Sequence, residues 1–103
     1  MTDLLLKGGE VLDPSQNLRG TLDIAVQDGS ISQVAPNIRP GPETRVVDVS
    51  GKLVVPGLID LHTHVYDGVN QTGVKPDLAG VYSGVTTLVD AGSAGCYTFG
   101  GFP

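Results

Sequence analysis

The sequence predicts a β-rich chain in two parts: a small antiparallel β layer over residues 1–55, and one strand–helix–strand unit of a parallel sheet over residues 56–103. Short apolar segments separated by turn residues fill the first part. A nearly continuous apolar run opens the second part, and the pattern changes near Pro56-Gly57. Of the 103 residues, 40% are hydrophobic and only 17% are charged, and 15 glycines and 7 prolines supply turns. This composition is typical of a folded protein and not of a disordered one.

Six short strands are expected in the first part, at residues 4–7, 11–12, 22–27, 31–35, 45–49 and 53–55. In the third of these, apolar residues at even positions alternate with Asp23, Ala25 and Gln27. We therefore expect the even face to be buried and the odd face to be wetter. Asp28-Gly29 follows, and this dipeptide favours the tight turn of a two-residue hairpin.

The second part begins with an apolar strand over residues 58–61 that leads into His62-Thr63-His64. A helix is expected over 76–82, because a proline and an aspartate suit its first turn. A β-branched strand follows over 84–90. A strand, a helix and a second strand at this spacing predict one βαβ unit.

The distribution of charge argues against several classes of partner. Six Lys and Arg stand against eleven Asp and Glu, for a net charge of −5, and the basic residues are dispersed, so no nucleic-acid partner is expected. No apolar run approaches the ~20 residues that span a bilayer, so no membrane partner is expected either. The first residues lack the basic start and long apolar stretch of a secretory signal, which predicts a cytoplasmic protein. The single cysteine, Cys96, agrees with a reducing compartment.

His62 and His64 are the only histidines, and they lie two residues apart at the end of an apolar strand. Side chains at this spacing point to the same face of a strand, so the two imidazoles can converge on one metal ion. Together they supply about half of a tetrahedral zinc site. The alternative is a pair of histidines that make only local hydrogen bonds.

Three further residues are weaker candidates. Asp60 shares the face of His62 and can support the site by hydrogen bonding to a ligand imidazole or to a neighbouring backbone group; its alternative is a turn or capping role. Asp90 ends the second parallel strand, where catalytic groups of parallel-sheet folds collect, but an Asp before Ala-Gly is equally a loop-starting residue. Cys96 has no basic neighbour to activate it and is interpreted as an ordinary loop thiol.

The segment Val54-Val-Pro-Gly-Leu-Ile-Asp-Leu-His-Thr-His64 resembles the hallmark segment of the amidohydrolase superfamily. Its members include dihydroorotases, hydantoinases, adenine deaminases and N-acyl-amino-acid deacylases. Upstream, residues 23–34 are similar to the strand–turn–strand that opens the β-sandwich domain of the family. Residues 64–68, 84–95 and 98–102 resemble the amidohydrolase/deacetylase or dihydroorotase-like branch. The resemblance covers essentially the whole chain.

The resemblance implies a fold in which a β-sandwich lies beside a TIM-like (β/α)8 barrel. Residues 1–55 then form part of the sandwich, and residues 56–103 form the first βαβ unit of the barrel, with strands 1 and 2. One or two zinc ions at the carboxyl ends of the barrel strands activate a water that attacks an amide or ester carbonyl of a small-molecule substrate. By resemblance, His62 and His64 are ligands of the more buried metal.

The other parts of such a site are a bridging carboxylated lysine, two more histidines and an aspartate that serves as general base. They come from later strands of the family fold, and no histidine follows His64. We therefore expect an N-terminal fragment of an amidohydrolase that is inactive alone, and a homo-oligomeric parent enzyme. The alternative is a non-catalytic paralogue or β-rich assembly module of the same fold.

Overall fold

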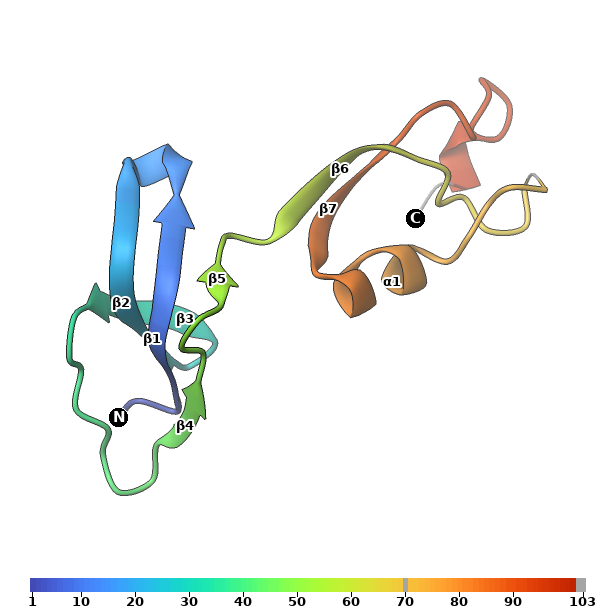
Figure 1. Cartoon of the computed structure of the whole chain (residues 1–103). Helices are drawn as coiled ribbons and strands as arrows, with labels where there is room; N and C mark the ends of the chain where they lie inside the picture. Colours follow the sequence, from blue (N-terminus) through green and yellow to red (C-terminus); the bar gives the residue numbers. More distant parts are fainter. Residues whose placement is uncertain (70, 102–103) are drawn as a thin grey trace. The chain divides into compact units, whose positions relative to one another are not determined.

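The computed structural model describes residues 1–69 and 71–101, and the chain divides into two compact units, Met1–Pro56 and Gly57–Pro103 (Figure 1). The first unit holds a five-stranded sheet and the second a two-stranded sheet. Over the described residues, none of the helices is long and apolar enough to cross a membrane.

The sheet of the first unit is mixed. Its strands are β1 (Leu4–Asp13), β2 (Leu18–Gln27), β3 (Ser30–Ala35), β4 (Arg45–Asp48) and β5 (Leu53–Val54). They follow the order β3-β2-β1-β4, with β5 also on β1. The three N-terminal strands pair antiparallel, but β4 and β5 run parallel to β1. The expectation of a purely antiparallel layer is therefore wrong, because residues 36–44 carry the chain back to the beginning of β1 before β4 starts.

The strands predicted at residues 4–7 and 11–12 are one continuous strand, β1, with an irregularity in its pairing between Leu6 and Gly9. Gly8 has φ +75°, and a Cβ atom at this position would lie 2.7 Å from Ser50 Oγ. The extra residue changes the face to which the following side chains point. Leu5 pairs with Ala25 before the bulge, whereas Val11 pairs with Gly20 after it and so points to the opposite face.

Both faces of β2 are buried at its centre. Ile24 is buried on the even face, as expected, but Asp23 and Ala25 are only 4% and 1% exposed on the odd face. The expectation of a wetter odd face is wrong here, because β2 lies between β1 and β3 and the segment after β3 reaches this face at Ile38.

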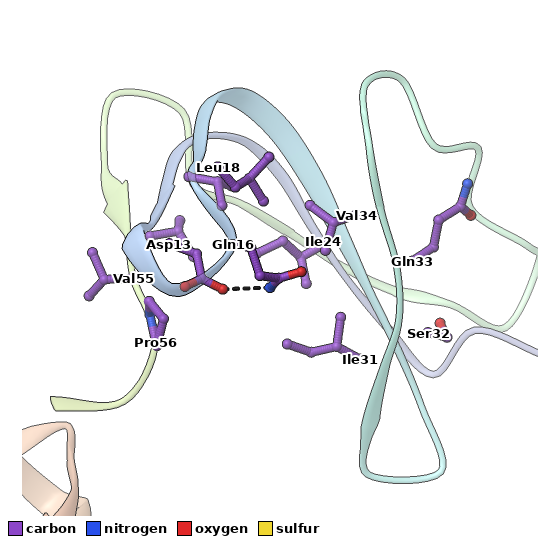
Figure 2. A pocket seen from close by; sticks show the side chains of 12 residues that line it. Asp13, Gln16, Leu18, Ile24, Ile31, Ser32, Gln33, Val34, Val55 and Pro56 are labelled. Atoms are coloured by element: carbon purple, nitrogen blue, oxygen red, sulfur yellow. Dashed lines mark hydrogen bonds between the residues drawn. The ribbon is translucent and has the colours of Figure 1, made fainter. Parts of the chain in front are cut away.

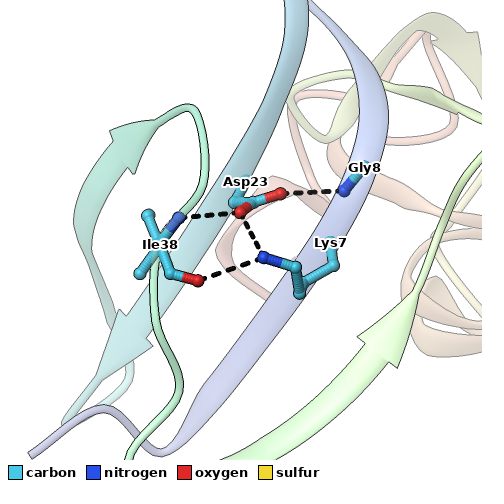
Figure 3. A network of polar contacts seen from close by, with 4 residues as sticks. All are labelled: Lys7, Gly8, Asp23 and Ile38. Atoms are coloured by element: carbon cyan, nitrogen blue, oxygen red, sulfur yellow. Dashed lines mark hydrogen bonds and ion pairs between the residues drawn. The ribbon is translucent and has the colours of Figure 1, made fainter.

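The Asp23 carboxylate is the centre of a polar network on the odd face (Figure 3). It accepts hydrogen bonds from Lys7 Nζ at 2.7 Å and from the backbone N–H groups of Gly8 and Ile38, each at 2.9 Å. Lys7 Nζ also donates to the carbonyl of Ile38 at 3.1 Å. The hydrogen bond from Lys7 is the largest effect on the pKa of Asp23 and, with the backbone bonds, lowers it although burial opposes the shift. The network ties β1, β2 and the segment after β3 together.

The hairpin turn between β2 and β3 is confirmed. Asp28 and Gly29 have φ values of +50° and +73°, and the flanking residues Gln27 and Ser30 are paired. Positive φ at both central residues is the conformation that suits the twist of a two-residue hairpin.

An apolar groove of about 550 Å³ lies in the first unit (Figure 2). Its lining includes Val11 and Ile24, and the exposed side chains of Ile31 and Val34 also face it. A hydrogen bond of 2.6 Å from Gln16 Nε2 to Asp13 Oδ2 lies among its polar lining.

The second unit contains two parallel strands, β6 (Leu58–Thr63) and β7 (Val85–Asp90), with the short helix α1 (Pro76–Ala79) between them in the chain (Figure 1). The helix predicted over 76–82 is shorter than expected and is followed by a 3-10 turn, Val81–Ser83. Gly80 separates the two with φ −97° and ψ −101°, values outside the helical region. Another 3-10 turn of this unit, Phe99–Gly101, lies near the end of the described chain.

Candidate metal centre

The candidate site lies at the carboxyl ends of β6 and β7, which meet at one edge because the strands are parallel. The last residues of the two strands, Thr63 and Asp90, are paired, and the N–H of Ala91 donates to the carbonyl of Thr63 at 2.9 Å. His62 lies inside β6 and His64 directly follows it. In open α/β sheets and barrels, this edge is where ligands bind and catalysis occurs.

The two imidazoles lie close to each other. Their ring centroids are 5.7 Å apart, and the ring planes meet at 76°. Two imidazoles that bind one tetrahedral zinc ion have centroids about 5 Å apart, so this separation fits a shared ion. His62 is exposed and His64 is half-buried. Within residues 1–69 and 71–101, no group of three or more potential metal ligands gathers.

The Asp90 carboxylate connects the loops that follow the two strands. Its Oδ2 accepts from the N–H of Val65 at 2.8 Å, and its Oδ1 accepts from the N–H groups of Gly92 at 3.1 Å and Ser93 at 2.7 Å. Burial is the largest single effect on the pKa of Asp90 and raises it, but the hydrogen bonds from Ser93, Val65 and Gly92 together lower the pKa. The structure thus places Asp90 as a loop-organising residue, and a catalytic role for it stays a prediction.

Ser93 is a site residue that sequence reasoning missed. Its hydroxyl oxygen lies 2.9 Å from Nδ1 of His64, and the residue is 9% exposed. The local signal was present, because an Asp whose side chain accepts from backbone N–H groups two and three residues later is a known turn pattern. That pattern identifies the turn at Asp90-Ala-Gly-Ser93, but it does not reveal that the turn delivers a hydroxyl to His64.

Tyr66 was also missed. Its ring is buried beside the site, and its hydroxyl donates to the carbonyl of Thr98 at 2.7 Å. Val65, the preceding residue in the same loop, is buried as well.

The two remaining sequence candidates lie on the surface. Asp60 is exposed, and its Oδ1 accepts from the backbone N–H of His62 at 3.0 Å. This hydrogen bond of Asp60 is to a backbone group, and a supporting role at a metal stays a prediction. Cys96 is exposed and carries a free thiol.

The chain is similar to known proteins in both sequence and fold. No family model matches the chain. The chain is 43% identical over 94 residues to the dihydroorotase of Aquifex aeolicus, which covers 86% of this chain and 22% of that protein. It is 43% identical over 83 residues to a deacetylase of Brucella anthropi, with 80% of this chain and 21% of that protein covered.

The fold agrees with the sequence comparison. A crystal structure of a dihydroorotase aligns with a TM-score of 0.82 and 31% identity, covering 98% of this chain and 26% of that one. The chain spans about a fifth of the length of these curated relatives. Its mostly-β mixed sheets match the N-terminal region of amidohydrolase structures. The chain belongs to the amidohydrolase superfamily and is similar to its dihydroorotases and deacetylases.

Proposed function

We propose that this chain supplies the first two ligands, His62 and His64, of a zinc-dependent hydrolase. The observation that carries the proposal is the pair of imidazoles, with centroids 5.7 Å apart, at the carboxyl edge of a parallel strand pair. In this proposal, residues 56–103 are the first βαβ unit of a TIM-like barrel and residues 1–55 are part of a β-sandwich. Because the chain covers only about a fifth of these relatives, the proposal assigns the activity to a longer protein that contains the chain.

The proposed reaction is hydrolysis of an amide, cyclic amide or acyl ester bond in a small molecule. Zinc, when bound, supplies Lewis acidity and an activated water for attack on the carbonyl carbon. His62 and His64 hold one side of the ion through neutral imidazole nitrogens. Asp90 keeps the loops after β6 and β7 together, which fixes the position of His64 at the edge of the sheet. The relatives named dihydroorotase and deacetylase support this range of substrates.

Two ligands are half of a tetrahedral site, so the 103-residue chain alone is proposed to bind zinc weakly and to be inactive. The remaining ligands and the general base belong to the rest of the longer protein. We propose a cytoplasmic homo-oligomer for that protein, without nucleic-acid or membrane partners.

The test uses the longest reading frame that contains this chain. Zinc content is measured by elemental analysis, and hydrolysis is assayed with dihydroorotate, a hydantoin and an N-acetyl amino acid. His62→Ala and His64→Ala are each expected to remove most of the bound zinc and most of the activity, because each opens the coordination shell. Asp77→Ala, an exposed change on α1, is the matched control and is expected to leave both unchanged.

Three results contradict parts of the proposal. The first is full activity and full zinc content in both histidine variants. The second is a reading frame without a later lysine, two further histidines and an aspartate, which favours a non-catalytic paralogue or assembly module. Stoichiometric, nanomolar zinc binding by the 103-residue chain as a monomer contradicts the statement that this chain holds half a site.

A further inference from the structure

The chain contains two Asp-Gly pairs, Asp28-Gly29 and Asp67-Gly68. All four residues are exposed, and a Cβ atom at either glycine would meet nothing within 4 Å. In the part of the chain that the structure describes, neither aspartate side chain has a hydrogen-bond or ion-pair partner. The two pairs therefore present the same reactive groups in equally open surroundings.

An aspartate that precedes a glycine can rearrange to isoaspartate without a catalyst. The backbone nitrogen of the glycine attacks Cγ of the aspartate, an N–Cγ bond forms, and the hydroxyl of the carboxylic acid leaves as water with the amide proton. A second water then adds to the main-chain carbonyl carbon of the aspartate and breaks the bond from this carbon to the same nitrogen. The main chain now runs through Cβ and Cγ, and the former main-chain carbonyl is a free carboxylate.

Two properties of the local structure control this reaction. Glycine has no side chain to hinder its nitrogen, and this is the same at both pairs. Closure of the five-membered ring also requires the backbone between the two residues to rotate, so contacts that fix this backbone slow the reaction. The fold therefore decides which of the two pairs reacts.

The hairpin between β2 and β3 holds the first pair in place. Gln27 and Ser30 are paired on either side of the turn, and the N–H of Asp28 donates to Oδ2 of Asp3 at 2.7 Å. Isoaspartate adds one carbon atom to the main chain, and this atom would break the pairing of Gln27 with Ser30. Both ring closure and formation of the product at Asp28 therefore require the hairpin to open.

The turn at Asp67-Gly68 is held more weakly. The backbone hydrogen bond across it joins the N–H of Val69 to the carbonyl of Tyr66 at 3.4 Å. This distance is longer than the usual range of about 2.7–3.2 Å. The turn belongs to no helix or strand, so rotation here breaks one long hydrogen bond and no strand pairing. The loop also has no pairing register for an additional carbon atom to disturb.

We propose that Asp67 is the site of spontaneous isoaspartate formation in this chain and that the hairpin protects Asp28. The product carries a free α-carboxylate and an additional main-chain carbon in the loop that follows His64. This α-carboxylate is the group that isoaspartyl methyltransferases esterify with S-adenosylmethionine, so methyl transfer is a direct probe of the product. The inference does not depend on the proposed metal site.

The experiment is incubation of the 103-residue chain for several weeks at physiological temperature and mildly acidic pH, where the acid form that loses water is present. After proteolysis, isoaspartate at each position is measured by enzymatic methyl transfer to the separated peptides and by mass spectrometry. Asp67 is expected to carry at least about 10-fold more isoaspartate than Asp28, because opening of the hairpin breaks more hydrogen bonds. Equal yields, a higher yield at Asp28, or no isoaspartate at either position overturns the proposal.

Unfolding the chain separates the effect of the fold from that of the sequence. In concentrated guanidinium chloride the two pairs are expected to react at similar rates, because glycine follows aspartate in both. The same difference between Asp67 and Asp28 in denaturant overturns the proposal, since it would then arise from the neighbouring residues in the sequence.

Three variants assign the signal. Asp67→Glu, which would have to close a six-membered ring, is expected to remove most of the methyl transfer, whereas the matched change Asp28→Glu leaves it. Methyl transfer that survives in Asp67→Glu overturns the assignment. Asp3→Ala releases the N–H of Asp28 and is expected to raise isoaspartate at Asp28 several-fold. An unchanged yield at Asp28 in this variant overturns the protection assigned to the contact with Asp3.

Discussion

Apolar strand residues are buried at the centre of the first unit, whereas those of β6 in the second unit are exposed. In the first unit, the buried apolar side chains lie in the strands themselves: Leu5 and Val11 in β1, and Ile24 and Ala25 in β2. These strands have neighbours in a five-stranded sheet, and the segment that reaches Ile38 covers part of one face. Other elements of the same unit therefore cover these apolar side chains.

In the second unit, the buried side chains among the described residues lie in the loops after the strands, at Val65, Tyr66 and Ser93. The strand β6 itself is exposed, with Leu61 at 73%, although it is as apolar as the strands of the first unit. One short helix, α1, connects β6 to β7 and offers little cover. An apolar run thus specifies a strand, whereas burial of that strand requires elements on both of its faces.

The largest expected effect concerns one leucine in each unit. Leu5 is 0% exposed, so Leu5→Ala is expected to destabilise the first unit by about 3 kcal/mol through lost burial and a residual cavity. Leu61→Ala is expected to change the stability of the second unit by less than about 0.5 kcal/mol, because the side chain is already exposed. Native-state hydrogen exchange of each variant, compared with the unsubstituted chain, measures the stability of both units. Equal effects at the two positions would remove the contrast between the units.

The next effect concerns the buried polar network of the first unit. Asp23→Ala leaves Lys7 Nζ and two backbone N–H groups without their acceptor, and a loss of about 2 kcal/mol in the free energy of unfolding is expected. The control is Glu10→Ala, which removes an exposed ion pair with Arg19 and is expected to cost less than about 0.5 kcal/mol. Urea unfolding followed by exchange of the β1 and β2 amides measures both. A harmless Asp23→Ala would show that the network does not tie the sheet together.

The pH dependence of the same network gives a smaller effect. The folded-state pKa of Asp23 is lowered from its ordinary value of 3.8, chiefly by the hydrogen bond from Lys7. Its contribution to stability is therefore present above that value and is lost as the pH falls through the lowered pKa. The stability gap between the unsubstituted chain and Asp23→Ala is expected to narrow as the pH is lowered from about 5 to about 2. A gap that widens over this range would contradict the assigned direction of the shift.

The smallest effect on stability concerns the exposed strand of the second unit. Uncovered apolar strands pair with other chains, so the 103-residue chain is expected to self-associate through β6. Ile59→Lys places a charge on this strand and is expected to reduce light scattering while changing stability by less than about 0.5 kcal/mol. Ile31→Lys, at an exposed position in β3, is the matched control in the first unit. Equal reductions from the two variants would show that association is not specific to the second unit.

Local sequence signals predicted the local features of the first unit. The Asp28-Gly29 hairpin is confirmed because its signal, two positive φ values, is carried by two adjacent residues. The predicted direction of β4 was wrong, because this direction depends on the route of residues 36–44, which no short sequence pattern encodes. The two strands expected at residues 4–7 and 11–12 are one strand, β1, with a bulge at Gly8. This bulge depends on a contact that is distant in the sequence, because Ser50, 42 positions later, leaves no room for a Cβ atom at Gly8.

The candidate site likewise combines features that the local sequence predicted with features that depend on distant contacts. The spacing of His62 and His64 and the motif around them were readable directly, because their proximity needs only the alternation of one strand. By itself, the sequence determined where strands and turns form, which histidines pair, and the family that the chain resembles. Only the tertiary structure decided that Asp23 is buried, that β6 is exposed, and that Ser93 contacts His64. Each of these depends on contacts between residues more than ten positions apart, or on their absence, and such contacts arise from chain topology and leave no periodic trace in the sequence.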